Sequence, residues 1–227
     1  MLALQLSIAV AIVYLAVLRL VDLNEREPLW VLILLFMLGF AASGVLRLSV
    51  PSSALELTVA GGAAAEALAQ LAALLAGIFV ITVAARTRGW SELNGLMDGL
   101  VYGAAVGLGF ATGEVFVRDL VHGASELFAP PFLTMLWTSA LAGLAHGVFG
   151  ALIGIGMAAA LHSATPAQRV LFALLGLGAG FGANALHRVL AYGNALGESG
   201  PWRAWVALLL PLLLVAAVAV PHLAEGR

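Results

Sequence analysis

Residues 95–117 have the sequence GLMDGLVYGAAVGLGFATGEVFV, an almost unbroken apolar run. Its length is close to the about 20 residues that a helix needs to cross the hydrocarbon core of a bilayer. Similar apolar runs occur at residues 2–19, 29–46, 56–84, 132–161, 170–191 and 204–221. Only helices and closed barrels satisfy their backbone groups in lipid, and these runs lack the alternation of barrel strands. The sequence therefore predicts an all-α, polytopic transmembrane bundle of about seven helices.

The composition favours the same class of protein. Of the 227 residues, 63% are hydrophobic and 10% are charged, whereas soluble domains have about 25% charged residues. No stretch between the apolar runs is long enough for a soluble domain, so residues 1–227 are expected to form one integral membrane domain within the lipid bilayer. A net charge of −2 argues against a nucleic-acid partner, and the absence of Cys excludes thiolate catalysis and thiolate metal ligands.

The distribution of Arg predicts how the chain crosses a cell membrane. More Arg residues lie on the side of the first, third and fifth loops and the C-terminus, namely Arg19, Arg26, Arg86, Arg88, Arg169 and Arg227. Because cytoplasmic loops are enriched in basic residues, a multi-pass protein with its N-terminus outside and its C-terminus in the cytoplasm is expected. Arg47 falls in a break between two apolar runs. Arg188 is expected to reach the interface, although its place beside His187 could tune a site there.

Four ionisable residues lie inside apolar runs: Glu66, Glu114, His146 and His187. A charge at the centre of a transmembrane helix costs about 2.5–3.5 kcal/mol on insertion scales, so such residues mark functional sites by default. Each of the four lies on a different run. A shared site explains them better than separate accidents.

Helical spacing predicts that these four side chains point toward one another. Each shares a stripe, with steps of three or four residues, with small residues of its own run, and small residues are where transmembrane helices approach closely. The four stripes are Gly62-Glu66-Gln70-Ala73-Gly77, Gly103-Gly107-Phe110-Glu114, Ser139-Gly143-His146-Gly150 and Gly176-Gly180-Asn184-His187. All four ionisable residues fall toward the predicted outer half of the membrane.

Several stretches, taken in order, carry a resemblance to a known family. They are DLNEREPLW (22–30), DGLVYGAAVGLGFATGE (98–114), AHGVFGALIG (145–154) and ANALHRVLAYGN (183–194). Their acidic Glu-Pro loop, their Asp-Gly…Tyr-Gly…Gly-Phe-Ala-x-x-Glu pattern and their two histidine motifs resemble the PrsW-type intramembrane proteases. These are distant relatives of the CAAX-prenyl and bacteriocin-processing proteases.

The sequence also departs from that family. The family's paired glutamates, followed three residues later by Lys, are represented here by Glu66, Ala67 and Gln70. Val115 replaces an Asn, and Ala191 stands where a polar residue is common. These departures keep open a catalytically inactive scaffold of the same fold. An ion-coupled transporter is a further alternative, because buried Glu and His also build proton relays, although no internal repeat is evident.

The resemblance implies an intramembrane endopeptidase that cuts a membrane-anchored protein near the outer face, as in first-site cleavage of an anti-sigma factor. Glu66, supported by Gln70, is expected to be the general base that activates water. Glu114, His146 and His187, with Asn184 in support, are expected either to bind Zn²⁺ or to hold water and the oxyanion directly by hydrogen bonds. The sequence leaves both mechanisms open.

Overall fold

The computed structural model describes residues 2–21, 28–50, 59–88, 95–122 and 132–193, together with 209, 212–213 and 215–217. Its long helices are α1 (Leu2–Val21), α2 (Leu29–Ser49), α4 (Val59–Arg88), α5 (Leu96–His122), α6 (Phe132–His162) and α7 (Pro166–Gly193). Within the described part, 6 helices are long and apolar enough to cross a membrane. This confirms the predicted all-α membrane bundle. The predicted helix at 204–221 lies almost wholly outside the described residues.

Helix ends follow from proline and capping residues. Pro28 precedes α2, and Val50, which stands before Pro51, is extended with φ −114° and ψ 121° because a following proline disfavours the helical conformation. Thr165 and Gln168 exchange side-chain and backbone hydrogen bonds at the start of α7, a capping box with proline in the first helical position. Because α2 ends only at Ser49, before the extended Val50, it includes Arg47, which the hydropathy pattern places in a break.

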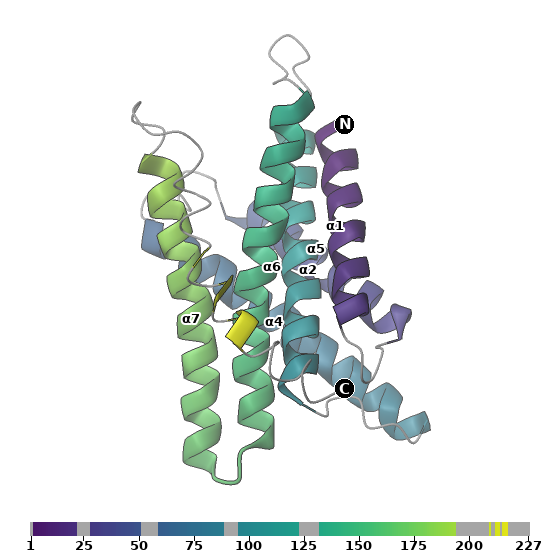
Figure 1. The fold of residues 1–227 in the computed structure, drawn as a ribbon, viewed down its shortest axis with the longest axis vertical. Helices are drawn as coiled ribbons and strands as arrows, with labels where there is room; N and C mark the ends of the chain where they lie inside the picture. Colours follow the sequence, from purple (N-terminus) through teal and green to yellow (C-terminus); the bar gives the residue numbers. More distant parts are fainter. Residues whose placement is uncertain are drawn as a thin grey trace.

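The central helix is α5, which lies between α6 and α2 with α1 beside it (Figure 1). In its membrane-spanning window 89% of the residues are buried, compared with 11% for α1. The outer helices expose large apolar side chains such as Ile12, Val45 and Phe79. In a membrane protein such surfaces face lipid, so α5 is shielded from lipid by its neighbours.

Glycines let the other helices approach α5 at backbone distance. A Cβ atom on Gly103 or Gly107 would overlap the carbonyl groups of Gly150 and His146 on α6. On the α2 side, a Cβ on Gly109 would overlap the Phe36 carbonyl in the same way. Close contact of this kind is typical of small residues at transmembrane helix interfaces. It fixes where His146 stands relative to α5.

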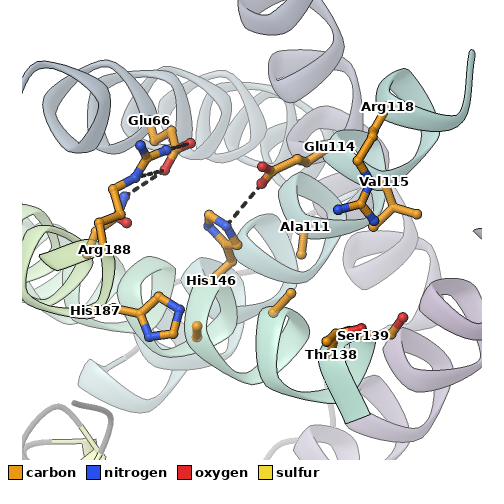
Figure 2. Close-up of a pocket in the computed structure, with 13 residues that line it drawn as sticks. Glu66, Ala111, Glu114, Val115, Arg118, Thr138, Ser139, His146, His187 and Arg188 are labelled. Atoms are coloured by element: carbon orange, nitrogen blue, oxygen red, sulfur yellow. Dashed lines mark hydrogen bonds and ion pairs between the residues drawn. The ribbon is translucent and has the colours of Figure 1, made fainter. Parts of the chain in front are cut away.

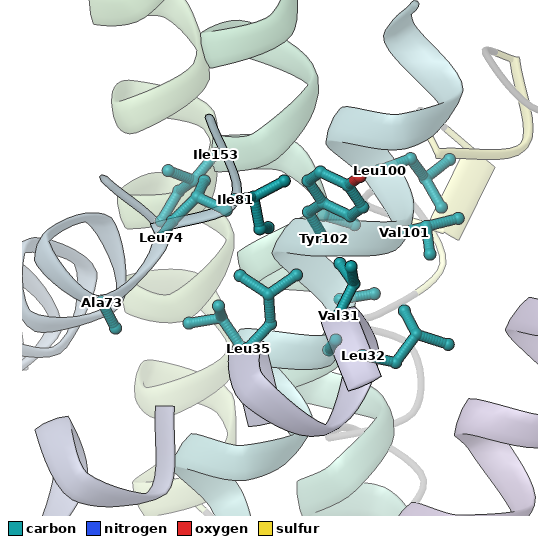
Figure 3. Packing of buried hydrophobic residues seen from close by; sticks show 14 of the residues in the cluster. Val31, Leu32, Leu35, Ala73, Leu74, Ile81, Leu100, Val101, Tyr102 and Ile153 are labelled. Carbon is teal, nitrogen blue, oxygen red and sulfur yellow. The ribbon is translucent and has the colours of Figure 1, made fainter. Parts of the chain in front are cut away.

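The interior contains an apolar core and a separate group of buried polar residues. The apolar core gathers residues from the early parts of α2 and α5 and the late parts of α4 and α6, including Val31, Tyr102, Leu74 and Ile153 (Figure 3). The buried polar residues Glu66, Gln70, His146 and Asn184 come from other parts of α4, α6 and α7. The polar site thus lies beside an apolar core.

Candidate active site

The four ionisable residues singled out in the sequence line one pocket of about 280 Å³ (Figure 2). Glu66 lies near the start of α4, while Glu114 and His187 lie near the ends of α5 and α7. At 1.5 Å per residue these three are about 9–12 Å from those helix ends, which share one face of the bundle, and His146 lies deeper on α6. Arg118, Ser139, Asn184 and Arg188 also contribute to the walls.

Glu66 is enclosed by cationic and amide donors. Its side chain is 1% exposed. Its Oε1 accepts hydrogen bonds from Arg47 Nη2 at 2.6 Å and from Arg188 Nη2, and its Oε2 accepts from Asn184 Nδ2 at 2.9 Å and from Arg188 Nε at 3.3 Å. A carboxylate buried in this way needs such partners, because an unpaired buried charge is strongly destabilising. Both of its oxygens are therefore engaged.

Glu114 stands at the open side of the pocket. Its side chain is 33% exposed, its Oε1 accepts from Arg47 Nη2 at 2.6 Å, and its Oε2 lies 3.4 Å from His146 Nε2. His146 Nδ1 lies 3.2 Å from the amide nitrogen of Gln70. With the amide nitrogen as donor and Nδ1 as acceptor, the neutral ring would carry its proton on Nε2, facing Glu114. Gln70, His146 and Glu114 thus form one hydrogen-bonded chain from α4 through α6 to α5.

His187 lines the same pocket but stands apart from the Glu114–His146 pair (Figure 2). The ring of Phe149 contacts both imidazoles, with its centroid 5.7 Å from that of His146 and 5.9 Å from that of His187. His187 therefore reaches the pocket from another wall. The structure brings Glu114 and His146 together, and it does not bring His187 to the same point.

This geometry tests the ligand set Glu114, His146 and His187 that the sequence suggested for a metal. Within the described ranges, no group of three or more His, Asp or Glu side chains is close enough to hold a metal ion. In addition, Arg47 already occupies one oxygen of Glu114 with a positive charge, which repels a cation at that position. As the side chains are arranged, this donor set does not fit a three-ligand metal centre.

Arg47 and Arg188 belong to the site, although the sequence pattern puts Arg47 in a break and favours the interface for Arg188, with a role beside His187 as the alternative. Instead of lying in a break or reaching the interface, they contact Glu66 with side chains 16% and 11% exposed. For Arg188 a signal was available, because it lies four residues after Asn184 on the same helical stripe. For Arg47 the sequence offers no comparable signal, since its partners come from α4 and α5.

Fold and pocket together define a multi-pass membrane protein with a carboxylate–imidazole site among its transmembrane helices. Comparison with known families is specific: the sequence model of the PrsW family intramembrane metalloproteases matches residues 27–219, and the chain belongs to this family. No curated protein and no solved structure matches the chain significantly. The resemblance noted in the sequence is thereby confirmed. The chain is an intramembrane protease, a hydrolase whose family acts on protein substrates in the membrane.

Proposed function

We propose that this pocket hydrolyses a peptide bond of a membrane-anchored protein, with Glu114 and His146 as the pair that activates water. One observation carries the assignment. Among the described residues that line the pocket, Glu114 is a carboxylate that both contacts an imidazole and is one-third exposed. A general base must lie within hydrogen-bond reach of the water whose proton it takes, and the exposed side of Glu114 leaves room for such a water.

Glu66, the base suggested by the sequence, is given a different role in this proposal. Its two oxygens accept four hydrogen bonds from Arg47, Arg188 and Asn184, and its side chain is almost inaccessible. A water molecule therefore has little room to approach either oxygen of Glu66. Glu66 is therefore a positioning residue that holds two guanidinium groups beside the pocket.

The proposed reaction needs no step through a metal. A water molecule bound beside the Glu114–His146 contact, on the exposed side of Glu114, loses a proton to this pair and attacks the carbonyl carbon of the scissile peptide. The oxyanion that forms faces His187 and Arg188, which line the pocket on the α7 side and can donate hydrogen bonds to it. The pair then returns the proton to the leaving amine, the C–N bond breaks, and a carboxylic acid and an amine result.

The substrate and its side of the membrane are part of the proposal. The pocket is near the ends of α5 and α7, about 9–12 Å from that face, so it suits a peptide bond just inside or beside the membrane surface. The Arg asymmetry puts this face outside the cytoplasm. A membrane-anchored anti-sigma factor cut at its first, extracytoplasmic site fits this geometry.

Cleavage by the purified full-length chain tests the proposal. The probe is a pool of single-span transmembrane peptides with randomised juxtamembrane segments, co-reconstituted in liposomes, with the products identified by mass spectrometry. The wild type is expected to cut near one membrane surface, and Glu114→Gln and His146→Ala to lose at least about 100-fold in rate. His162→Ala, at the far end of the same helix α6, serves as the matched control and should cleave normally.

Two results would contradict this assignment. Normal cleavage by Glu114→Gln together with inactivity of Glu66→Gln would return the base to Glu66. Tight binding of peptides by the wild type without any product would instead identify an inactive scaffold.

A further inference from the structure

A single nitrogen atom joins the two carboxylates of the site. Arg47 Nη2 lies 2.6 Å from Glu66 Oε1 and 2.6 Å from Glu114 Oε1. The three residues belong to α2, α4 and α5. Arg47 is 19 positions from Glu66 and 67 positions from Glu114 in the sequence. Arg47 is therefore the point at which α2 enters a site otherwise built on α4, α5, α6 and α7.

Helix α2 is seated so that Arg47 must reach this point. Phe36, Phe40 and Ser43 follow one another at helical spacing on the face of α2 that contacts α5, and Arg47 is the next position on that face. A Cβ on Gly113 would lie 3.0 Å from Ser43 Cβ. Gly113 immediately precedes Glu114. The close α2–α5 contact thus ends where Arg47 meets Glu114.

The two arginines of the site have different tasks. Arg188 binds both oxygens of Glu66 through Nε and Nη2, so Glu66 keeps a guanidinium partner without Arg47. Glu114 is in a different position. Its contacts in the described part are Arg47 on Oε1 and His146 on Oε2. Arg47 therefore decides which oxygen of Glu114 faces the imidazole.

We propose that Arg47 is a positioning residue for the water-activating pair, because it holds Glu114 Oε1 so that Oε2 faces His146 Nε2. This inference rests on the proposed role of Glu114 and His146. It assigns to α2 a part in the reaction without contact between Arg47 and the substrate. Because both contacts come from one nitrogen, the ammonium group of a lysine can reproduce them.

The first test is the kinetics of Arg47 variants in liposomes, with the peptide that the wild type cleaves best in the pool described above. Arg47→Gln is expected to lower kcat at least about 10-fold with little change in KM, since a badly oriented base affects the chemical step rather than binding. Arg47→Lys should recover most of kcat. Arg19→Gln, at the end of α1, is the matched control and should behave as the wild type.

The second test does not depend on cleavage. The Nε2 resonance of His146 is followed by ¹⁵N NMR of the full chain in detergent micelles, assigned by its loss in His146→Ala. Arg47→Gln is expected to shift this resonance about as far as Glu114→Gln does, whereas Arg47→Lys and Arg19→Gln leave it near the wild-type position.

These readouts separate the inference from the proposed function. Wild-type kcat and an unshifted resonance in Arg47→Gln would overturn the role of Arg47. Full activity of Glu114→Gln would overturn the proposed function, and the resonance would still decide whether Arg47 orients Glu114. If Arg47→Gln does not fold, Arg47→Lys decides: retained kcat and resonance support the inference, and loss of both in a folded protein overturns it.

Discussion

At the scale of single residues, the site is a row of alternating charges, Arg188, Glu66, Arg47 and Glu114, each in contact with the next, and the His146 imidazole contacts Glu114 at its end. Two carboxylates shared between two guanidinium groups keep the formal charge of the interior near zero. This arrangement makes it possible to bury them inside a membrane, where a single charge is expensive. It also makes each member sensitive to loss of its neighbour.

Removal of Glu66 is expected to destabilise the protein more than it harms the chemistry. Glu66→Gln leaves Arg47 paired with Glu114 but takes the carboxylate partner from the partly buried Arg188, and breaking a buried ion pair of this kind costs about 3–5 kcal/mol. Thermal unfolding in detergent measures this loss. The double variant Glu66→Gln/Arg188→Gln should lose less than the sum of the single variants. Unfolding at the wild-type temperature in Glu66→Gln would show that the row is not structural.

Zinc content tests the mismatch between the family's description and the donor set. Because His187 is separated from Glu114 and His146, and Arg47 holds one oxygen of Glu114, the purified wild type is expected to carry well below one zinc per chain. Elemental analysis after gel filtration measures this, with His146→Ala as the comparison. One zinc per wild-type chain that is lost in His146→Ala would show that the three predicted ligands do assemble.

Some residues of the site could be identified from the sequence alone, and its two arginines could not. Glu66, Glu114, His146 and His187 are conspicuous because they interrupt apolar runs, and all four line the pocket. Arg47 and Arg188 lie near helix ends, where an arginine that reaches the interface has the same sequence pattern as one that turns inward. Their role depends on contacts between helices, which a single sequence does not specify.

At the scale of helices, glycine placement sets the distances between the functional side chains. Hydropathy locates the apolar middle of a helix but not a polar last turn. For α2 it therefore puts Arg47 in the break between two helices instead of in the helix. Helix continuation through Arg47 depends on local backbone preference and on Pro51 beyond Val50, not on hydrophobicity. Small-residue stripes predicted close approach, and α5 shows it on the faces toward α6 and α2.

A matched pair of glycines on α2 tests this role. A Cβ on Gly39 would overlap the backbone carbonyl of Val106 on α5, whereas a Cβ on Gly44 would meet nothing within 4 Å. Gly39→Ala should push α2 away from α5, lower the unfolding temperature and reduce cleavage about as far as Arg47→Gln. Gly44→Ala should be neutral or stabilising by up to about 1 kcal/mol, because alanine restricts the unfolded chain. Equal behaviour of the two variants in thermal unfolding and cleavage would contradict the role of close packing.

At the scale of the whole molecule, the site faces one side of the membrane, and the position of α5 makes this possible. Which helix is central could not be predicted from hydropathy, because α5 is no more apolar than the helices that surround it. Its burial follows from its glycines, which admit neighbours on two faces. The Arg distribution indicates the orientation of the bundle, and that orientation stays a prediction.

Cysteine labelling tests the orientation, and the chain suits it because it contains no Cys. Ser49 is an exposed residue at the end of α2 near the site, and Ala164 is an exposed residue in the turn between α6 and α7 at the opposite end. In intact cells a membrane-impermeant maleimide should label Ser49→Cys, and it should label Ala164→Cys only after permeabilisation. The reverse pattern would place the site on the cytoplasmic face and remove extracytoplasmic cleavage.

The most direct test is a double-mutant cycle on cleavage, with Glu114→Gln, His146→Ala and the double variant compared by kcat/KM in liposomes. Residues that act as one catalytic unit are strongly non-additive. The double variant should therefore be no slower than the slower of the two single variants. If the two losses multiply instead, Glu114 and His146 act independently, and they do not activate the water as one pair.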